Sequence, residues 1–213
     1  MFPADTVEPP QSIVPLMRRR LFILFLCAAV CILVGTGVAL WRYLGVDGVS
    51  SYSNQPVLFE DADLRLPPDL AGNTGRIRVV HFWDPDCVSC NEITDAHLNY
   101  LITMFRDADI DFYSVRKPGT HGQLPAFLRG KIKPLRGIEG MERIPASPAI
   151  AIWDANGKLA YAGPYSTGLV CSSNNSFVEP ILNKLVEGLH VEPVPMVAVG
   201  CYCPWYTARG RHG

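Results

Sequence analysis

The stretch Phe82-Trp83-Asp84-Pro85-Asp86-Cys87-Val88-Ser89-Cys90 decides the fold. The residues just before it, 76–83 (RIRVVHFW), are rich in β-branched and aromatic side chains, which predicts a buried strand. Residues 90–105 then place apolar side chains at intervals of three or four, which predicts a helix. A Cys-x-x-Cys motif therefore lies where a buried strand gives way to the start of a helix.

That position suits thiol chemistry. The unpaired N–H groups and partial positive charge of a helix N-terminus favour a thiolate, which is the nucleophilic form of cysteine. Cys87 is therefore the predicted nucleophile, and Cys90 is placed to resolve a mixed disulfide. The nearby carboxylates of Asp84 and Asp86 oppose the thiolate, so we expect Cys87 to be only moderately acidified. A structural disulfide is the alternative, and no metal is expected, because a zinc site normally takes four ligands.

Further elements follow in alternation. The pattern predicts strands over 110–115 and 149–153, a strand over 158–162 that returns through the turn at Asn156-Gly157, and a short helix over 123–129. A last helix is predicted over 177–189, with Ser176 as its N-cap. This order predicts an α/β fold, with a mixed central sheet and helices on both of its faces.

On these residues the chain resembles the thioredoxin superfamily, especially its membrane-tethered bacterial members. Phe82-Trp83 leading to Cys87 and Cys90 matches one family motif, and residues 147–158 (SPAIAIWDANGK) look like the family's cis-proline strand and hairpin. The resemblance implies a thioredoxin-like fold over residues 57–190. It also implies a substrate-binding groove at Trp83, Ser147 and Pro148, with a cis Pro148 and with the Cys87 sulfur reachable from that groove.

The match departs from the family at His81, which stands where many relatives carry a buried acid. His81 could be a proton relay for Cys90 or a core histidine with its ring nitrogens bonded to backbone. More narrowly, the chain resembles an uncharacterised group of bacterial anchored proteins. They share the Phe-Trp-Asp-Pro strand exit and a C-terminal Gly-Cys-x-Cys-Pro-Trp, here residues 200–205.

An uncharged apolar run from Leu21 to Trp41 would form a helix of about 31 Å, enough to cross a bilayer core. Three arginines precede it (residues 18–20), which places the N-terminus in the cytoplasm and the rest outside it. A cleaved signal peptide is the alternative, but its apolar region would be shorter. The expected parts are a cytoplasmic tail (1–17), a transmembrane anchor (18–42), a linker (43–56), the thioredoxin-like domain (57–190) and a cysteine-containing tail (191–213).

The remaining cysteines leave alternatives open. Cys27 and Cys31 lie within the membrane run as small apolar side chains. Outside it, Cys171 lies in a loop, and Cys201 and Cys203 lie in the tail. A structural bond from Cys171 to a tail cysteine is the favoured expectation. The alternative is that Cys201 and Cys203 form a second redox pair, which requires the tail to fold back over Cys87 and Cys90.

Together these features predict a thiol–disulfide oxidoreductase, anchored as a single-pass protein in the bacterial inner membrane, with its domain in the periplasm. Its partners would be exported protein thiols or disulfides and a membrane electron donor, and no cofactor is expected. Two alternatives remain: a Cu(I) metallochaperone, since thiolates select that ion, and a non-catalytic assembly factor. A net charge of −1 gives no reason to expect nucleic acid as a partner.

Overall fold

The computed structural model describes residues 14–43, 49–168 and 174–206. It divides the chain into two compact units, one ending at Asp47 and the other beginning at Gly48. The first unit contains helix α1 (Val14–Tyr43). Within it, the segment Arg19–Ala39 is long and apolar enough to span a membrane. The expected extent of the anchor thus falls within one continuous helix, whereas the expected tail residues 1–13 lie outside the described part of the chain.

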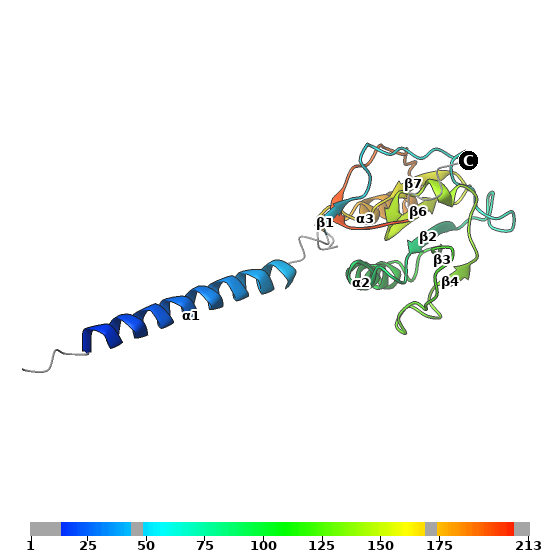
Figure 1. The fold of residues 1–213 in the computed structure, drawn as a ribbon. Coiled ribbons are helices and arrows are strands. Elements are labelled where there is room, and N and C mark those ends of the chain that lie inside the picture. The colour runs from blue at the N-terminus through cyan, green and yellow to red at the C-terminus, as the bar shows by residue number, and fades with distance from the viewer. Residues whose placement is uncertain (1–13, 44–48, 169–173, 207–213) are drawn as a thin grey trace, which may run out of the picture. The chain divides into compact units, whose positions relative to one another are not determined.

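The second unit is built on a five-stranded mixed sheet in the order β4-β3-β2-β6-β7 (Figure 1). The sheet strands are β2 (Ile77–Trp83), β3 (Ile110–Arg116), β4 (Lys133–Leu135), β6 (Ala149–Trp153) and β7 (Leu159–Gly163). Strands β2, β3 and β4 are parallel, whereas β6 and β7 are antiparallel to their neighbours. The helices are α2 (Val88–Met104) and α3 (Val178–Val186), with a short 3₁₀ turn, η2 (Met141–Arg143).

Helices α2 and α3 pack on the same face of the sheet. Leu98 and Leu101 from α2 share one apolar cluster with Val178 and Leu182 from α3 and with Val79 from β2. The alternate side chains of the strands point into a second cluster on the opposite face. The prediction of helices on both faces is therefore wrong for the described residues. The second face is covered by loops and by residues 199–205, called the C-terminal segment below.

The sequence-predicted strands and both long helices are present to within a few residues. The N-cap residue of α3 is Phe177, one position after the expected Ser176, although the Ser176 hydroxyl accepts hydrogen bonds from the N–H groups of Val178 and Glu179. The short helix expected over 123–129 is not formed. That segment is a turn in which the N–H groups of Leu128 and Arg129 both donate to the Pro125 carbonyl.

Short strands attach the ends of the unit to the rest of it. Strand β1 (Val49–Ser51) pairs antiparallel with β8 (Val199–Cys201), and β5 (Ala146–Ser147) pairs antiparallel with β9 (Cys203–Pro204). The unit is therefore larger than the expected span 57–190, since residues from the predicted linker and the predicted tail are folded into it. The element order, the Cys-x-x-Cys helix and the cis proline before β6 define a thioredoxin-like fold.

Candidate functional site

Cys87 is the N-cap of helix α2. Its N–H donates to the Asp84 carbonyl at 2.9 Å, and its own carbonyl accepts from the Asn91 N–H at 3.0 Å. A second bond, from the Asn91 side-chain amide to the Asp84 carbonyl, fixes the turn to the helix. The strand exit is thereby held so that the Cys87 sulfur lies at the positive end of α2, as its place in the sequence predicts.

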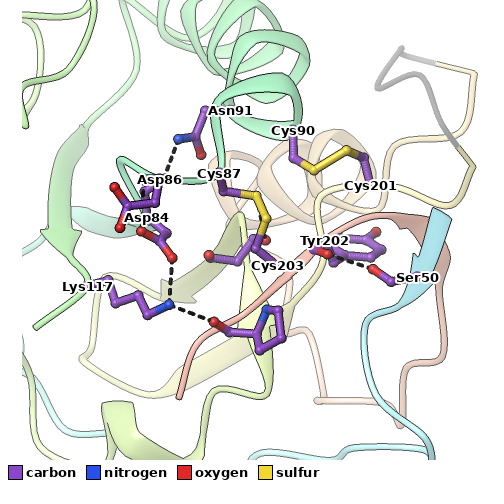
Figure 2. The surroundings of a disulfide bond; sticks show 12 residues. Ser50, Asp84, Asp86, Cys87, Cys90, Asn91, Lys117, Cys201, Tyr202 and Cys203 are labelled. Atoms are coloured by element: carbon purple, nitrogen blue, oxygen red, sulfur yellow. Dashed lines mark hydrogen bonds and ion pairs between the residues drawn. A yellow bond between two sulfur atoms is a disulfide. The ribbon is translucent and has the colours of Figure 1, made fainter. Parts of the chain in front are cut away.

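Both cysteines of the Cys-x-x-Cys motif are bonded to the C-terminal segment. Cys87 forms a disulfide with Cys203, and Cys90 forms one with Cys201 (Figure 2). The expected structural bond from Cys171 to a tail cysteine is therefore wrong, and Cys171 itself lies outside the described residues. The reason is that β8 and β9 carry both tail cysteines to the start of α2.

The C-terminal segment occupies the groove that the family resemblance assigns to substrate. The peptide bond between Ser147 and Pro148 is cis, as expected, and the Cys87 sulfur lies 4.0 Å from the Ser147 carbonyl oxygen. In the β5–β9 pair, Cys203 stands directly opposite Ser147. The expectation that the Cys87 sulfur is reachable is wrong in this state, because the segment covers it and leaves Cys87 only 3% exposed.

Trp205 anchors this segment. Its side chain is fully buried in the cluster that contains Phe82, and its backbone N–H donates to the Pro145 carbonyl at 3.2 Å. Trp83, expected to bind substrate, is also buried, at 6% exposure. Burial of an indole of this size contributes apolar stabilisation that helps to hold the segment in place.

Two backbone carbonyl groups of the segment accept hydrogen bonds from the rest of the unit. The Ser50 hydroxyl donates to the Tyr202 carbonyl at 2.6 Å, and the Gly168 N–H donates to the Val199 carbonyl at 2.7 Å. The chain passes so close to Gly168 at Gly200 that a Cβ there would lie 2.5 Å from the Gly168 carbonyl oxygen. This contact gives a physical reason for the glycine in the Gly-Cys-x-Cys-Pro-Trp stretch.

Lys117 connects the turn that precedes Cys87 to the C-terminal segment. Its ammonium group lies 2.6 Å from the Asp84 carboxylate and donates to the Pro204 carbonyl at 2.9 Å (Figure 2). The expected opposition of Asp84 to the Cys87 thiolate is therefore largely cancelled by a paired cation. Asp86 is exposed, so solvent screens its charge.

Two buried titratable side chains lie beneath the site. His81 is completely buried, which lowers its pKa to about 3, and its Nδ1 lies 2.8 Å from the Tyr165 hydroxyl. Its Nε2 lies 3.7 Å from Asp95 Oδ1, and neither atom has a hydrogen-bond partner among the described residues. Burial raises the pKa of Asp95 to about 6. The group that titrates near neutral pH is thus Asp95 rather than His81.

The reduced form of the site would bring three thiol groups together. The sulfur atoms of Cys87, Cys90 and Cys203 all lie within 4.8 Å of one another. Such a set can exchange disulfide bonds by short movements. Soft thiolates at this spacing could also hold a soft metal ion.

Reasoning from the sequence missed Lys117, Asp95 and Trp205. Lys117 follows β3 as Asp84 follows β2, and the carboxyl ends of neighbouring parallel strands meet at one edge of a sheet, so their pairing could have been found. Asp95 lies three residues before Leu98 on α2, which places an acid on the buried face. Nothing local in the sequence marks Trp205 as a core residue.

The chain is similar to several proteins of known structure. A hypothetical protein from Sinorhizobium meliloti 1021 matches with a TM-score of 0.51 at 14% identity, covering 75% of this chain and 100% of that chain. An uncharacterized conserved protein from Geobacillus kaustophilus matches with a TM-score of 0.47 at 17% identity, covering 75% and 97%. The thioredoxin domain of a thiol-disulfide oxidoreductase from Bacteroides vulgatus matches with a TM-score of 0.33 at 19% identity, covering 54% and 79%.

The comparison with curated proteins gives no match. A family model described as a domain of unknown function, DUF6436, matches residues 55–205. This range begins just before the isolated bridge at Val57 and ends at Trp205, so it includes the site and the segment bonded to it. The chain therefore belongs to the DUF6436 family and carries its domain on a thioredoxin-like fold.

Proposed function

We propose that this protein is a thiol–disulfide oxidoreductase that acts on the thiols or disulfides of exported proteins. One observation carries the proposal. A sulfur at the N-terminus of α2 is joined to a cysteine on an extended strand, and that strand pairs with the residue before the cis proline. The site thus holds, within one chain, the arrangement that attack on a substrate disulfide would produce.

The chemistry follows from that arrangement. The β5–β9 pair shows how an extended chain adds to β5 through backbone hydrogen bonds, so that its cysteine is held at the helix end. Cys87 would attack as a thiolate, because the N-terminus of α2 favours the negative charge. Cys90 lies one turn further on and would resolve the mixed disulfide. Trp83, Ser147 and Pro148 would shape the groove.

A proton must move whenever Cys90 changes between thiol and thiolate. We assign this role to the buried pair of Asp95 and His81, whose Oδ1 and Nε2 atoms lie 3.7 Å apart. The pKa of about 6 lets Asp95 accept a proton near neutral pH, whereas His81 with a pKa of about 3 stays neutral. This assignment keeps the relay proposed at His81 but moves the titrating group to α2.

Insulin reduction by the detergent-solubilised chain, with dithiothreitol as electron source, tests the activity. Turnover should be abolished by Cys87→Ser, whereas Cys27→Ser should leave it unchanged, because Cys27 belongs to the apolar helix α1 and not to the unit that holds the site. Retention of full activity in Cys87→Ser would exclude the proposal.

We further propose that α1 anchors the protein in the inner membrane, with the domain in the periplasm and a membrane protein as electron donor. The support is the apolar segment Arg19–Ala39 and the arginines at its N-terminal side. Alkaline phosphatase fused after Gly213 should be active, and the chain should resist extraction by alkaline carbonate. An inactive fusion or a carbonate-extractable chain would contradict this topology.

A second candidate function is Cu(I) binding by the reduced site. It is supported by the close approach of the sulfurs of Cys87, Cys90 and Cys203. Titration of the fully reduced chain with Cu(I) tests it. Stoichiometric retention of the ion together with an absence of insulin reduction would favour this function over the oxidoreductase.

A further inference from the structure

We propose that Cys201 and Cys203 form the solvent-facing redox pair of the protein, through which an external dithiol exchanges electrons with Cys87 and Cys90. This inference rests on the proposed oxidoreductase function and names the residues that meet the substrate. It assigns a catalytic role to the C-terminal segment.

The first argument is accessibility. Cys87 and Cys90 are 3% and 5% exposed, whereas Cys201 and Cys203 are both half-buried. A disulfide is attacked at one of its two sulfurs, and an external thiolate must reach that sulfur along the axis of the bond. In both bonds, the tail cysteine is the more exposed of the two residues.

The second argument is that the segment is held in place by more than its disulfides. Trp205 is fully buried, Lys117 binds the Pro204 carbonyl, and β8 pairs with β1. An external peptide cannot pair with Ser147 while Cys203 occupies that position. The segment is therefore a resident part of the site, and substrates meet its cysteines first.

The third argument concerns the leaving group. Attack by an external thiolate on the Cys203 sulfur breaks the bond to Cys87, which departs as a thiolate. Cys87 is the N-cap of α2, so this departure is favoured over that of a thiolate without such a helix end. A more stable leaving thiolate departs faster, which selects Cys203 as the point of entry.

The exchange then balances within the protein. In the mixed disulfide, the second thiol of the external molecule attacks the external sulfur that is bonded to Cys203. The external molecule leaves as a disulfide, and Cys203 becomes a thiol. Cys87 next attacks the Cys90 sulfur and breaks the bond to Cys201. Two electrons and two protons have entered, the protein now holds a Cys87–Cys90 disulfide, and Cys201 and Cys203 are thiols.

The spacing of the sulfurs permits this internal step. Those of Cys87, Cys90 and Cys203 lie within 4.8 Å of one another, and that of Cys201 is bonded to Cys90. The Cys87 sulfur therefore lies within 4.8 Å of the sulfur that it attacks. The same steps in reverse would pass electrons from the protein to an external disulfide.

Peptide mapping tests the rearrangement. The oxidised full-length chain in detergent is treated with one equivalent of reduced dithiothreitol, quenched with acid and labelled with N-ethylmaleimide. We expect Cys201 and Cys203 to carry at least tenfold more label than Cys87 and Cys90, with a Cys87–Cys90 disulfide present. Label on one complete original pair, with the other original disulfide intact, would overturn the inference.

Insulin turnover by two variants separates this inference from the proposed function. Cys201→Ser/Cys203→Ser should lose at least tenfold in rate, because its Cys87–Cys90 disulfide stays beneath the segment. Adding Trp205→Ala should undock the segment and restore turnover. A wild-type rate in the double variant overturns the inference alone, whereas inactivity of the wild type and of both variants overturns the proposed function as well.

Discussion

The ring of Trp205 packs edge-on against that of Phe82, with centroids 5.7 Å apart and ring planes at 86°. This pair joins the end of the C-terminal segment to the strand that leads to Cys87. The segment that covers Cys87 is thus continuous with the hydrophobic core.

Trp205→Ala should lower the free energy of unfolding by about 3–5 kcal/mol, the usual cost of truncating a buried large aromatic side chain. Tyr206→Ala is the matched control, because that neighbouring ring is 43% exposed. Thermal unfolding of both oxidised variants provides the measurement. Equal midpoints would show that the Trp205 cavity contributes nothing to the fold.

Lys117→Met should loosen the C-terminal segment and slow the reaction of Cys87 in the reduced protein with iodoacetamide by about three- to tenfold. The substitution leaves the buried Asp84 carboxylate without its cation, and that charge then opposes the Cys87 thiolate. Lys131→Met is a suitable control, since its ammonium group contacts only the Asn99 side chain in the hydrogen bonds of the described residues. An unchanged rate in Lys117→Met would mean that the ion pair does not influence Cys87.

Asp95→Asn should stabilise the protein at pH 8 but not at pH 4. Burial raises the pKa of Asp95 from 3.8 to about 6, so the folded state binds the proton more tightly than the unfolded state. The stability this provides is present below pH 3.8 and is lost as the pH rises through 6, where the buried carboxylate becomes charged.

The free energy of unfolding of Asp95→Asn relative to the wild type, measured in urea, should therefore rise by up to about 3 kcal/mol between pH 4 and pH 8. Glu92→Gln, an exposed change on the same helix, should show little such dependence. A pH-independent difference between Asp95→Asn and the wild type would show that Asp95 does not ionise within the fold.

Gly200→Ala should destabilise the docked segment by about 1–3 kcal/mol. The added Cβ would lie 2.5 Å from the Gly168 carbonyl oxygen and 3.1 Å from the Tyr202 ring, so the backbone must move. Val199→Ala is the control, because Val199 is 50% exposed. The midpoint of thermal unfolding reports the effect, and similar midpoints for the two variants would refute the close contact.

Much of this fold could be predicted because its signals are local. The β-branched run before Trp83, the apolar spacing of α2 and the Asn156-Gly157 turn each determine an element without information from elsewhere in the chain. The position of the cis proline and of the Cys-x-x-Cys pair followed from two short motifs. These parts of the site agree with the expectation.

The C-terminal segment could not be placed in this way. Its contacts join residues more than a hundred positions apart, and β8 and β9 are too short to show a period of alternation. The predicted loop 165–175 and the tail each carry cysteines, and sequence alone does not choose between them. The choice is made by β1, which pairs with β8, and by the apolar cavity that Trp205 fills.

Cys87 is synthesised 116 residues before Cys203, and Cys90 is synthesised 111 residues before Cys201. During that interval the nearest thiol to each is the other, and a short loop closes more readily than a long one. A nascent chain in an oxidising compartment is therefore expected to form the local bond first and to reach its final pairing by reshuffling. Maturation of this domain would then depend on the disulfide isomerases of its compartment, and a strain that lacks them should accumulate the locally bonded isomer.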